Sequence, residues 1–364
     1  MLFLKKLLSY RNEYQDFEIG DKMRAIQITE ANTFKSIKQK KCKPKNGEVL
    51  LKIIQVGICG SDILIYHGKH KYAKLPLVMG HECAAIVEDV GEGVDTVAIG
   101  DLVTVQPHFF CNDCYACKRG STNVCEDLVF MGVHIDGFFR EYVTVKSWNV
   151  LKLPSSFTID MAMLVEPLAV AVNAARKGDV KEGERAVVIG AGTIGNLTAQ
   201  SLAAMGVEVL ISDILDNKLF IVGNCGIHHC LNTSCMDLEE GIQRSFNGGK
   251  VSAIYDCAAV PKVMKQIIDC AANSSKIIII GSYKEPVELD ITRLQRREIS
   301  LLGVMQYSRE DFLNAIAMLN EGKININGII TRRYSLDNLN EAFQYIDEQP
   351  QNVMKVAIEC CEQR

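Results

Sequence analysis

Four cysteines lie close together in the sequence, at Cys111, Cys114, Cys117 and Cys125. In a reducing compartment, four thiolates at such short spacing suit a closed tetrahedral Zn²⁺ site. Because the protein would fill every coordination position, an ion there would be structural and would not meet a substrate. Reactive or buried thiols without a metal are the alternative interpretation. Apart from Cys59, the remaining cysteines lack ligand spacing, and we expect them to be ordinary core or surface thiols.

A second set of metal-ligating residue types is spread over three short segments. Cys59 and Asp62 belong to Cys-Gly-Ser-Asp, His81 and Glu82 to Gly-His-Glu, and Glu166 to Val-Glu-Pro. Each segment alone is weak evidence, because a His after Gly is more often structural and a Glu before Pro commonly stands in a turn. The segments become informative only through their order along the chain.

A glycine-rich motif predicts a dinucleotide site. The apolar run at 187–189 leads into Gly-x-Gly-x-x-Gly and then a helical pattern, a context in which the backbone approaches a pyrophosphate at a helix N-terminus. Asp213 ends the next predicted strand, where a carboxylate accepts hydrogen bonds from the ribose and repels a 2′-phosphate, so NAD is predicted over NADP. The alternative is a glycine-rich turn in a nucleotide-free domain. The residues expected to contact the cofactor are Gly190, Gly192, Ile194, Gly195, Asp213 and Lys218.

The elements that must position these residues fall into two patterns. From residue 23 the chain shows short strands punctuated by Gly and Pro, which predict an irregular β-barrel or sandwich. After a helical segment at 159–177 it alternates strand, turn and helix, which predicts a parallel sheet covered by helices. The tail is expected to form helices at 309–320 and 336–346 and a strand at 353–358.

Composition limits the class of protein. The 364 residues are 48% hydrophobic and 23% charged, with a net charge of −4 and no basic stripe, so we expect two globular domains and no nucleic-acid partner. The first residues alternate charge with apolar residues and do not form a signal peptide. No apolar run reaches the roughly 18 residues of a spanning helix, so a soluble cytoplasmic protein without a membrane partner is expected.

Together the motifs resemble the zinc-dependent medium-chain dehydrogenases over about residues 23–358. The similarity is greatest to the polyol and sugar-acid branch, which includes sorbitol, galactitol-phosphate, threonine and L-galactonate or L-gulonate dehydrogenases. Glu166 stands where simple alcohol dehydrogenases usually have a third ligand Cys. The resemblance implies an α/β protein with a GroES-like β-barrel catalytic domain and a Rossmann doubly wound parallel sheet. The expected divisions are an extension at 1–22, a catalytic domain at 23–175 and 308–364, and an NAD-binding domain at 176–307.

The resemblance also implies roles for the dispersed residues. The catalytic zinc sphere would comprise Cys59, His81 and Glu166, with Glu82 as a direct or water-mediated ligand. Asp62 would accept a proton from the far nitrogen of His81 and fix its tautomer. Ser61 would pass the substrate proton to a relay, or alternatively only cap a helix.

Two positions depart from the family. Many relatives have a His five residues after the catalytic Cys, whereas this chain has Leu64, so His67 or His134 is considered as a substitute. Gln306 stands where sorbitol dehydrogenases and sugar-acid enzymes carry an Arg, the natural clamp for carboxylate or phosphate. A neutral polyol is therefore favoured. The residues expected to line the substrate pocket are Gln306, Tyr307 and His134.

These arguments predict an NAD-linked oxidoreductase that converts a secondary alcohol of a polyol or sugar-derived small molecule to a ketone. An L-threonine 3-dehydrogenase-like or general alcohol dehydrogenase is the alternative among enzymes. A non-catalytic NAD- or thiol-responsive regulatory protein is the alternative from another class, and it predicts a missing metal ligand. The resemblance further implies a homodimer or homotetramer.

Overall fold

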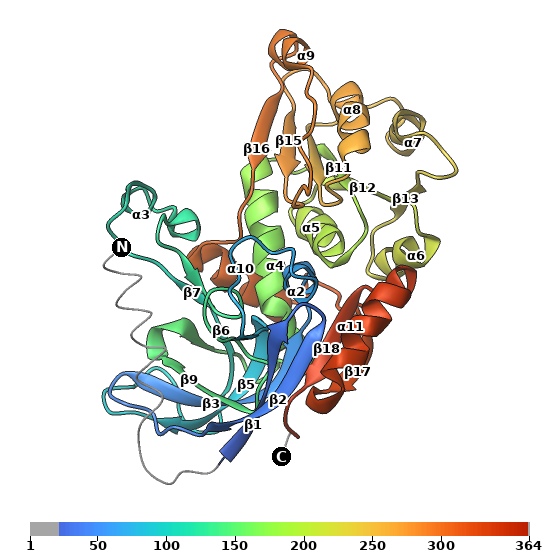
Figure 1. Ribbon diagram of the computed structural model, residues 1–364. Coiled ribbons are helices and arrows are strands. Elements are labelled where there is room, and N and C mark those ends of the chain that lie inside the picture. The colour runs from blue at the N-terminus through green and yellow to red at the C-terminus, as the bar shows by residue number, and fades with distance from the viewer. Residues whose placement is uncertain (1–21, 363–364) are drawn as a thin grey trace. The chain divides into compact units, whose positions relative to one another are not determined.

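The computed structural model describes residues 22–362, and these form two compact units. The β-rich unit contains the chain up to Glu166 and again from Ile330, and the α/β unit contains Pro167–Ile329 (Figure 1). The predicted extension at 1–22 lies outside the described residues except for Lys22, which begins the first strand. Among the described residues, no helix is long and apolar enough to cross a bilayer.

Twelve strands build the β-rich unit. They are β1 Lys22–Glu30, β2 Thr33–Lys40, β3 Glu48–Gly57, β4 Leu77–Val78, β5 Glu82–Val90, β6 Leu102–Val105, β7 His108–Phe109, β8 Val129–Phe130, β9 Tyr142–Lys146, β10 Val150–Lys152, β17 Ile330–Ser335 and β18 Lys355–Glu359. The largest sheet has the order β10-β6-β5-β3-β18-β17, with β9 also paired to β3. Because strands from both ends of the chain meet in this sheet, the unit is closed by long-range pairing.

Short helices connect the strands of this unit. They are α2 Gly60–Tyr66, α3 Tyr115–Lys118 and α11 Leu339–Glu348, with 3₁₀ turns η1 Thr122–Val124, η2 Ser147–Asn149, η3 Leu336–Asn338 and η4 Pro350–Asn352. The apolar faces of the strands form one core, in which Phe138, Phe139 and Phe343 are fully or almost fully buried. Burial of apolar surface is the main stabilising contribution to such a unit.

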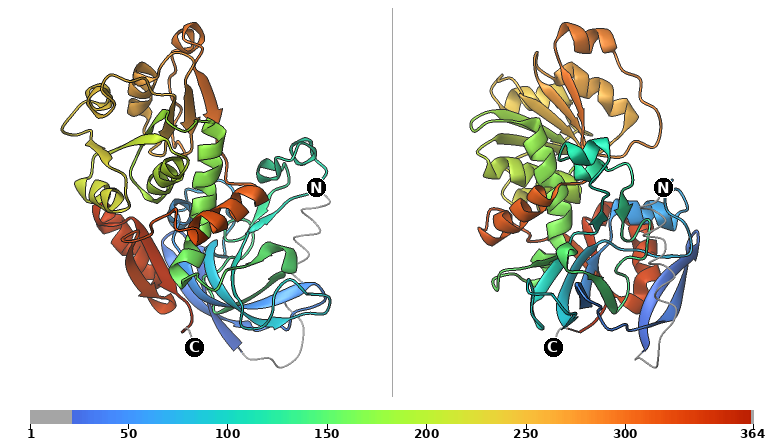
Figure 2. Two further views of the ribbon diagram at one scale, coloured as in Figure 1. Left: turned by 180° about the vertical axis from the view of Figure 1, so that it is seen from behind. Right: turned by 90° about the vertical axis from the view of Figure 1, so that its left-hand side faces the viewer.

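The α/β unit alternates strands and helices. They are β11 Arg185–Ile189, α5 Thr193–Ala204, β12 Glu208–Asp213, α6 Asp216–Asn224, β13 His229–Asn232, α7 Leu238–Ser245, β14 Ala253–Asp256, α8 Pro261–Cys270, β15 Lys276–Ile279, α9 Ile291–Arg296, β16 Ser300–Gly303 and α10 Arg309–Asn320. All strands are parallel, in the order β13-β12-β11-β14-β15-β16, and helices pack along the sheet (Figure 2). The strand order reverses between β11 and β14, which is where such sheets bind ligands at their carboxyl ends.

The boundaries between the units differ from the expected ones. The division falls after Glu166, inside helix α4 (Ile159–Gly178), and after Ile329, whereas the sequence predicted divisions after residues 175 and 307. Helix α10 therefore belongs to the α/β unit. An ion pair between Arg176 Nε and the buried Asp311 Oδ1 at 2.8 Å joins α10 to the second half of α4.

Candidate metal centres and cofactor site

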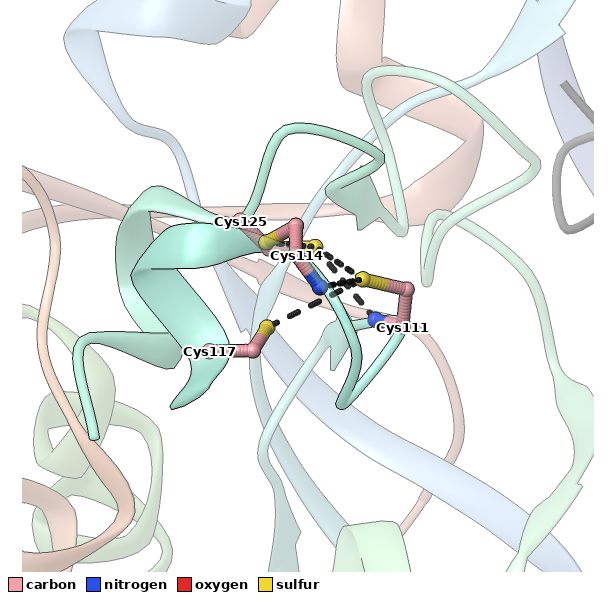
Figure 3. Close-up of side chains that lie close together, drawn as sticks. All are labelled: Cys111, Cys114, Cys117 and Cys125. Atoms are coloured by element: carbon pink, nitrogen blue, oxygen red, sulfur yellow. Dashed lines mark hydrogen bonds between the residues drawn. The ribbon is translucent and has the colours of Figure 1, made fainter. Parts of the chain in front are cut away.

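The four predicted cysteines come together beside helix α3 (Figure 3). Their ligand atoms all lie within 4.8 Å of one another, and Cys111 Sγ is 3.5 Å from Cys125 Sγ and 4.0 Å from Cys117 Sγ. A tetrahedral zinc ion with Zn–S bonds of about 2.3 Å requires sulfur–sulfur distances of about 3.8 Å. The geometry therefore fits a structural zinc ion.

Backbone hydrogen bonds to the sulfur atoms of this cluster favour the binding of a cation. The backbone N–H groups of Asp113 and Cys114 donate to Cys111 Sγ at 3.4 and 3.3 Å. Hydrogen bonds from the backbone of Glu126 and Cys117 lower the pKa of Cys114 to about 6. Burial raises the pKa of Cys117 and Cys125, so the lowered pKa makes Cys114 the thiol of these three that most readily becomes the thiolate that binds metal.

The second cluster gathers Cys59, His81 and Glu82, whose ligand atoms also lie within 4.8 Å of one another. Cys59 is the N-cap of α2, and His81 immediately precedes β5, where Glu82 begins the strand. His81 and Glu82 are almost completely buried. Burial alone would lower the pKa of His81, but the negative charges of Asp62 and Cys59 outweigh it and raise this pKa. Such an environment attracts a cation.

Asp62 holds the two ligand segments together. Its Oδ2 accepts a hydrogen bond from the backbone N–H of Cys59 at 2.9 Å, and its Oδ1 accepts one from Gly80 at 3.3 Å. The predicted bond to His81 is not formed, because Asp62 Oδ1 is 3.7 Å from His81 Nδ1. Burial raises the pKa of Asp62, and the proximity of His81 opposes that shift. In this structure Asp62 therefore positions the segments and does not fix the tautomer of His81.

Two buried polar atoms in this region have no hydrogen-bond partner among the described residues. They are His81 Nδ1 and Ser61 Oγ. Leaving a buried polar atom unpaired costs about 1–3 kcal/mol, so such atoms commonly await a ligand. Ser61 lies inside the first turn of α2 while Cys59 caps the helix, which argues against the capping role considered for Ser61. The donor set of Cys59, His81 and Glu82 fits a catalytic zinc ion. His81 Nδ1 is not counted toward it, because that nitrogen faces Asp62.

Glu166, predicted with Cys59 and His81 as one of the three main ligands, is not in the compact cluster, whereas Glu82, predicted as the additional ligand, is. The side chain of Glu166 is buried in α4, outside the group of ligand atoms formed by Cys59, His81 and Glu82. It remains close enough that its negative charge raises the pKa of His81 and of Lys355. The structure thus places Glu166 near the site and Glu82 nearer to the other two ligands.

Sequence reasoning missed Lys355. This lysine of β18 is only 4% exposed, and its Nζ lies 2.7 Å from both carboxylate oxygens of Glu82 and 3.1 Å from the carbonyl oxygen of Ile58. A lysine in the otherwise apolar run 353–358 was the available signal, because a buried ammonium requires a partner. Its partner could not be inferred, since β18 and β5 are remote in sequence.

The dinucleotide turn has the predicted geometry. Gly190 follows β11 with φ of +95°, and a Cβ atom at Gly195 would lie 1.8 Å from the carbonyl oxygen of Gly190. A Cβ at Gly192, the N-cap of α5, would meet no atom within 4 Å. The turn therefore leaves open space in front of the helix N-terminus, where a pyrophosphate binds. Ile194 lies in the first turn of α5, and Lys218, half-buried, lies in α6.

Asp213 ends β12 beside this turn. Its Oδ2 accepts a hydrogen bond from the backbone N–H of Ala191 at 2.7 Å, and its Oδ1 accepts from Ile214 and Leu215 at 2.8 and 3.0 Å. At the end of the next strand but one, Asp256 accepts from the backbone of the 258–259 loop and from the hydroxyl of Tyr283. Two carboxylates thus order the backbone on either side of Gly190.

The predicted relay and pocket residues have other contacts. His67 places Nδ1 2.9 Å from Asn32 Oδ1 and Nε2 3.0 Å from Asp347 Oδ1, so both ring nitrogens are already used. His134 Nδ1 accepts from the backbone N–H of Phe130 at 2.9 Å. Neither geometry supports a replacement for the histidine absent at position 64.

Of the two predicted pocket residues from the α/β unit, Tyr307 needs correction and Gln306 does not. Tyr307 is only 1% exposed and its ring lies 5.3 Å from that of Phe312, so it belongs to the core and not to an accessible pocket. Gln306 has φ of +46°, and its carbonyl oxygen accepts from Asn173 Nδ2 at 2.7 Å. Its half-buried side chain stays a predicted substrate contact.

Comparison with known proteins agrees with this architecture. Residues 45–155 match the alcohol dehydrogenase GroES-like domain, and residues 193–321 match the zinc-binding dehydrogenase domain. The 2-dehydro-3-deoxy-L-galactonate 5-dehydrogenase of Pseudoalteromonas atlantica is 31% identical over 93% of this chain and 99% of its own. The L-threonine 3-dehydrogenase of Pyrococcus abyssi is 32% identical over 83% of this chain and 88% of its own length.

A solved structure agrees as well. An alcohol dehydrogenase from Escherichia coli, complexed with NADH, superposes with a TM-score of 0.87 and 31% identity, over 93% of this chain and 100% of that chain. The class defined by the two units and their sites is that of the zinc-binding dehydrogenases with a GroES-like and a Rossmann domain. Within it, this chain belongs to the polyol and sugar-acid branch of the medium-chain dehydrogenases.

Several predictions from the sequence are thereby confirmed. The fold class is correct, and the protein is an NAD-linked alcohol dehydrogenase with zinc and NAD as its cofactors. The alternative of a non-catalytic protein required a missing metal ligand, whereas every predicted position carries a residue of ligating type. Cys59, His81 and Glu82 lie together, and Glu166 is close enough for its charge to raise the pKa of His81.

Proposed function

We propose that this protein oxidises a secondary hydroxyl group of a polyol or sugar-derived substrate to a ketone and transfers the hydride to NAD. The observation that carries the proposal is that the ligand atoms of Cys59, His81 and Glu82 lie within 4.8 Å of one another. The hydroxyl of Ser61, two residues after Cys59, has no hydrogen-bond partner among the described residues. Three protein ligands of these types leave one coordination position for a substrate oxygen.

Each residue of the zinc site would have a separate role. Cys59 and His81 would hold the zinc ion, with Glu166 or Glu82 as the carboxylate ligand. A bound zinc ion acts as a Lewis acid that makes a hydroxyl group more acidic. Ser61 Oγ would accept a hydrogen bond from the substrate hydroxyl and, as that hydroxyl ionises, would pass its own proton on to water, since Oγ is buried and makes no hydrogen bond among the described residues. Asp62 holds the two ligand segments together by accepting hydrogen bonds from the backbone of Cys59 and of Gly80.

The α/β unit supports NAD as the hydride acceptor. The space at Gly192 admits the pyrophosphate, and Asp213 presents a carboxylate at the end of β12. A carboxylate there accepts hydrogen bonds from the ribose hydroxyls of NAD and repels the 2′-phosphate of NADP. We therefore propose a preference for NAD.

The substrate class follows from what the site lacks. Gln306 stands where an arginine would clamp a carboxylate or phosphate, so a neutral polyol is preferred to a sugar acid or sugar phosphate. L-Threonine is the second candidate, because the L-threonine 3-dehydrogenase of Pyrococcus abyssi is 32% identical to this chain. It is disfavoured by Leu64 at the position where that group has a histidine. The expected homo-oligomer stays a prediction.

A screen of zinc-loaded protein tests the proposal. NADH formation should be measured with hexitols, pentitols, hexonates, sugar phosphates and L-threonine, with metal quantified in each preparation. The proposal expects turnover with polyols above that with threonine. Turnover with threonine alone would favour the second candidate, and no turnover with any secondary alcohol would overturn the proposal.

A further inference from the structure

Three histidines from segments far apart in the sequence lie close together beside the zinc site. The ring centroid of His81 is 5.0 Å from that of Phe130, whose backbone N–H donates to His134 Nδ1 at 2.9 Å. The ring of Tyr72 lies 6.4 Å from that of His134 and 6.2 Å from that of His70. Among the described residues, only His81 of the three belongs to a group that could hold a metal ion. The other two imidazoles are therefore available for a different role.

Backbone contacts attach these two imidazoles to the segment of the ligand histidine. The turn that carries His134 packs on the carbonyl oxygen of Gly80, because a Cβ atom at Gly137 would lie only 2.1 Å from that oxygen. Strand β4, which follows the loop of His70, is hydrogen-bonded to the same turn, since the carbonyl oxygen of Val78 accepts from the N–H of Gly137 at 2.6 Å. The loop and the turn are thus joined to each other and to the residue that precedes the zinc ligand.

Hydrogen bonds to the backbone also decide which ring nitrogen carries the proton. His70 Nδ1 accepts from the N–H groups of Tyr72 and Ala73 at 3.3 and 3.2 Å, and His134 Nδ1 accepts from that of Phe130. A nitrogen that accepts a hydrogen bond carries no proton, so the neutral imidazole is protonated on Nε2. Neither Nε2 makes a hydrogen bond among the described residues, and both side chains are half-buried. Each ring therefore offers one unpaired N–H donor.

The two donors are uncharged at physiological pH. Burial lowers the pKa of His70, and the nearby His81 lowers it further. Burial, and then the nearby His70, lower the pKa of His134. A neutral imidazole donates to a hydroxyl oxygen but offers no positive charge to a carboxylate or phosphate. This chemistry agrees with the absence of an arginine at position 306.

We propose that His70 and His134 bind, through their Nε2–H groups, the hydroxyl groups of the substrate that are not oxidised. Two neutral donors beside the zinc site suit a polyol, because a simple secondary alcohol has no further hydroxyl to receive them. His134 was expected from the sequence to line the pocket, whereas His70 was not. The inference rests on the proposed function in placing the reacting hydroxyl at the zinc ion.

Asparagine variants test the inference with little change to the turns. Asparagine Oδ1 can replace Nδ1 as the acceptor of the backbone N–H groups, while the Nε2–H donor is lost. The values of kcat and KM should be measured for wild type, His70→Asn, His134→Asn and the double variant, with the best polyol of the screen and with 2-butanol. Each single variant should lower kcat/KM for the polyol about threefold to tenfold, mainly through KM, as expected for one neutral hydrogen bond. The values for 2-butanol should not change.

His67→Asn is the matched control. His67 belongs to the same loop, but both of its ring nitrogens are already bound, to Asn32 and Asp347. This variant should therefore keep the wild-type ratio of kcat/KM for the polyol over that for 2-butanol. Equal losses with the two substrates in His70→Asn and His134→Asn would overturn the inference and leave the proposed function intact.

Nitrogen NMR of the imidazoles adds a readout that needs no turnover. His70 and His134 should both show the Nε2–H tautomer. Their Nε2 resonances should shift when the polyol, but not 2-butanol, is added to zinc-loaded protein with NADH. The Nδ1–H tautomer, or Nε2 resonances that do not respond to any polyol, would overturn the inference. If no secondary alcohol is turned over, the proposed function fails, and the NMR response to polyols still decides the inference.

Discussion

The role of Asp213 can be tested by replacing it with asparagine. The structure shows three backbone N–H groups donating to its carboxylate, one of them, from Ala191, to Oδ2 at 2.7 Å. The asparagine side chain keeps one oxygen that can accept from the N–H groups of Ile214 and Leu215. Its amide NH₂ group would face the N–H of Ala191, so that hydrogen bond would be lost. The lost charge-assisted bond should cost about 1.5–3 kcal/mol of stability in the turn.

The same substitution should change cofactor preference. Losing a charge-assisted hydrogen bond to the ribose of NAD should weaken NADH binding by about tenfold to a hundredfold, since 1.4 kcal/mol corresponds to a factor of ten. The carboxylate also repels a 2′-phosphate, by about 4 kcal/mol for unit charges 4 Å apart near a protein surface. We therefore expect the ratio of kcat/KM for NAD over that for NADP to fall at least a hundredfold.

Fluorescence titration with NADH and NADPH measures the binding effect without any substrate, and steady-state kinetics with both cofactors measure the preference. Asp216→Asn is the matched control, because Asp216 is an exposed neighbour whose contact is with Asn232 at 2.6 Å. Its cofactor ratio should not change. An unchanged ratio in Asp213→Asn would refute the assignment of ribose recognition to this carboxylate.

Three other substitutions have defined outcomes. Ser61→Ala should lower kcat by about a hundredfold to ten-thousandfold. Its melting temperature should not change, because the Ser61 hydroxyl has no hydrogen-bond partner among the described residues. Turnover near that of the wild type would show that Ser61 takes no part in proton transfer. Cys114→Ser should release one zinc ion per chain and lower the melting temperature, and metal analysis showing full zinc content would contradict the structural site. Gly195→Ala should abolish NADH binding, because its Cβ would lie 1.8 Å from the carbonyl oxygen of Gly190; titration showing normal affinity would disprove the close approach.

Local patterns predicted much of the fold. The helical segment expected at 159–177 is α4 at Ile159–Gly178, and the helix expected at 309–320 is α10 at the same residues. The apolar run at 187–189, expected to lead into the glycine turn, is the second part of β11 at Arg185–Ile189. These elements are long or lie beside glycine turns, so their periodicity and their ends are visible in the sequence.

Features that depend on tertiary contacts could not be predicted in this way. The parallel pairing of β17 with β18, and the insertion of β18 beside β3, join segments that are far apart in the chain. The 3.7 Å separation of Asp62 from His81 and the burial of Tyr307 follow from backbone placement that no motif encodes. The metal-ligating residues were identifiable because their types carry the chemistry, whereas the partner of Glu82 was not.

The position of β18 has a consequence for how the protein is made. Until this strand has been synthesised, Gln55–Gly57 of β3 lacks its neighbour on one side, although β5 can already pair on the other. An unpaired strand edge of this kind can associate with other chains, and the α/β unit must be translated before the gap is filled. A shortened chain that ends before residue 355 would therefore expose an aggregation-prone edge and bury an uncompensated carboxylate at the same place.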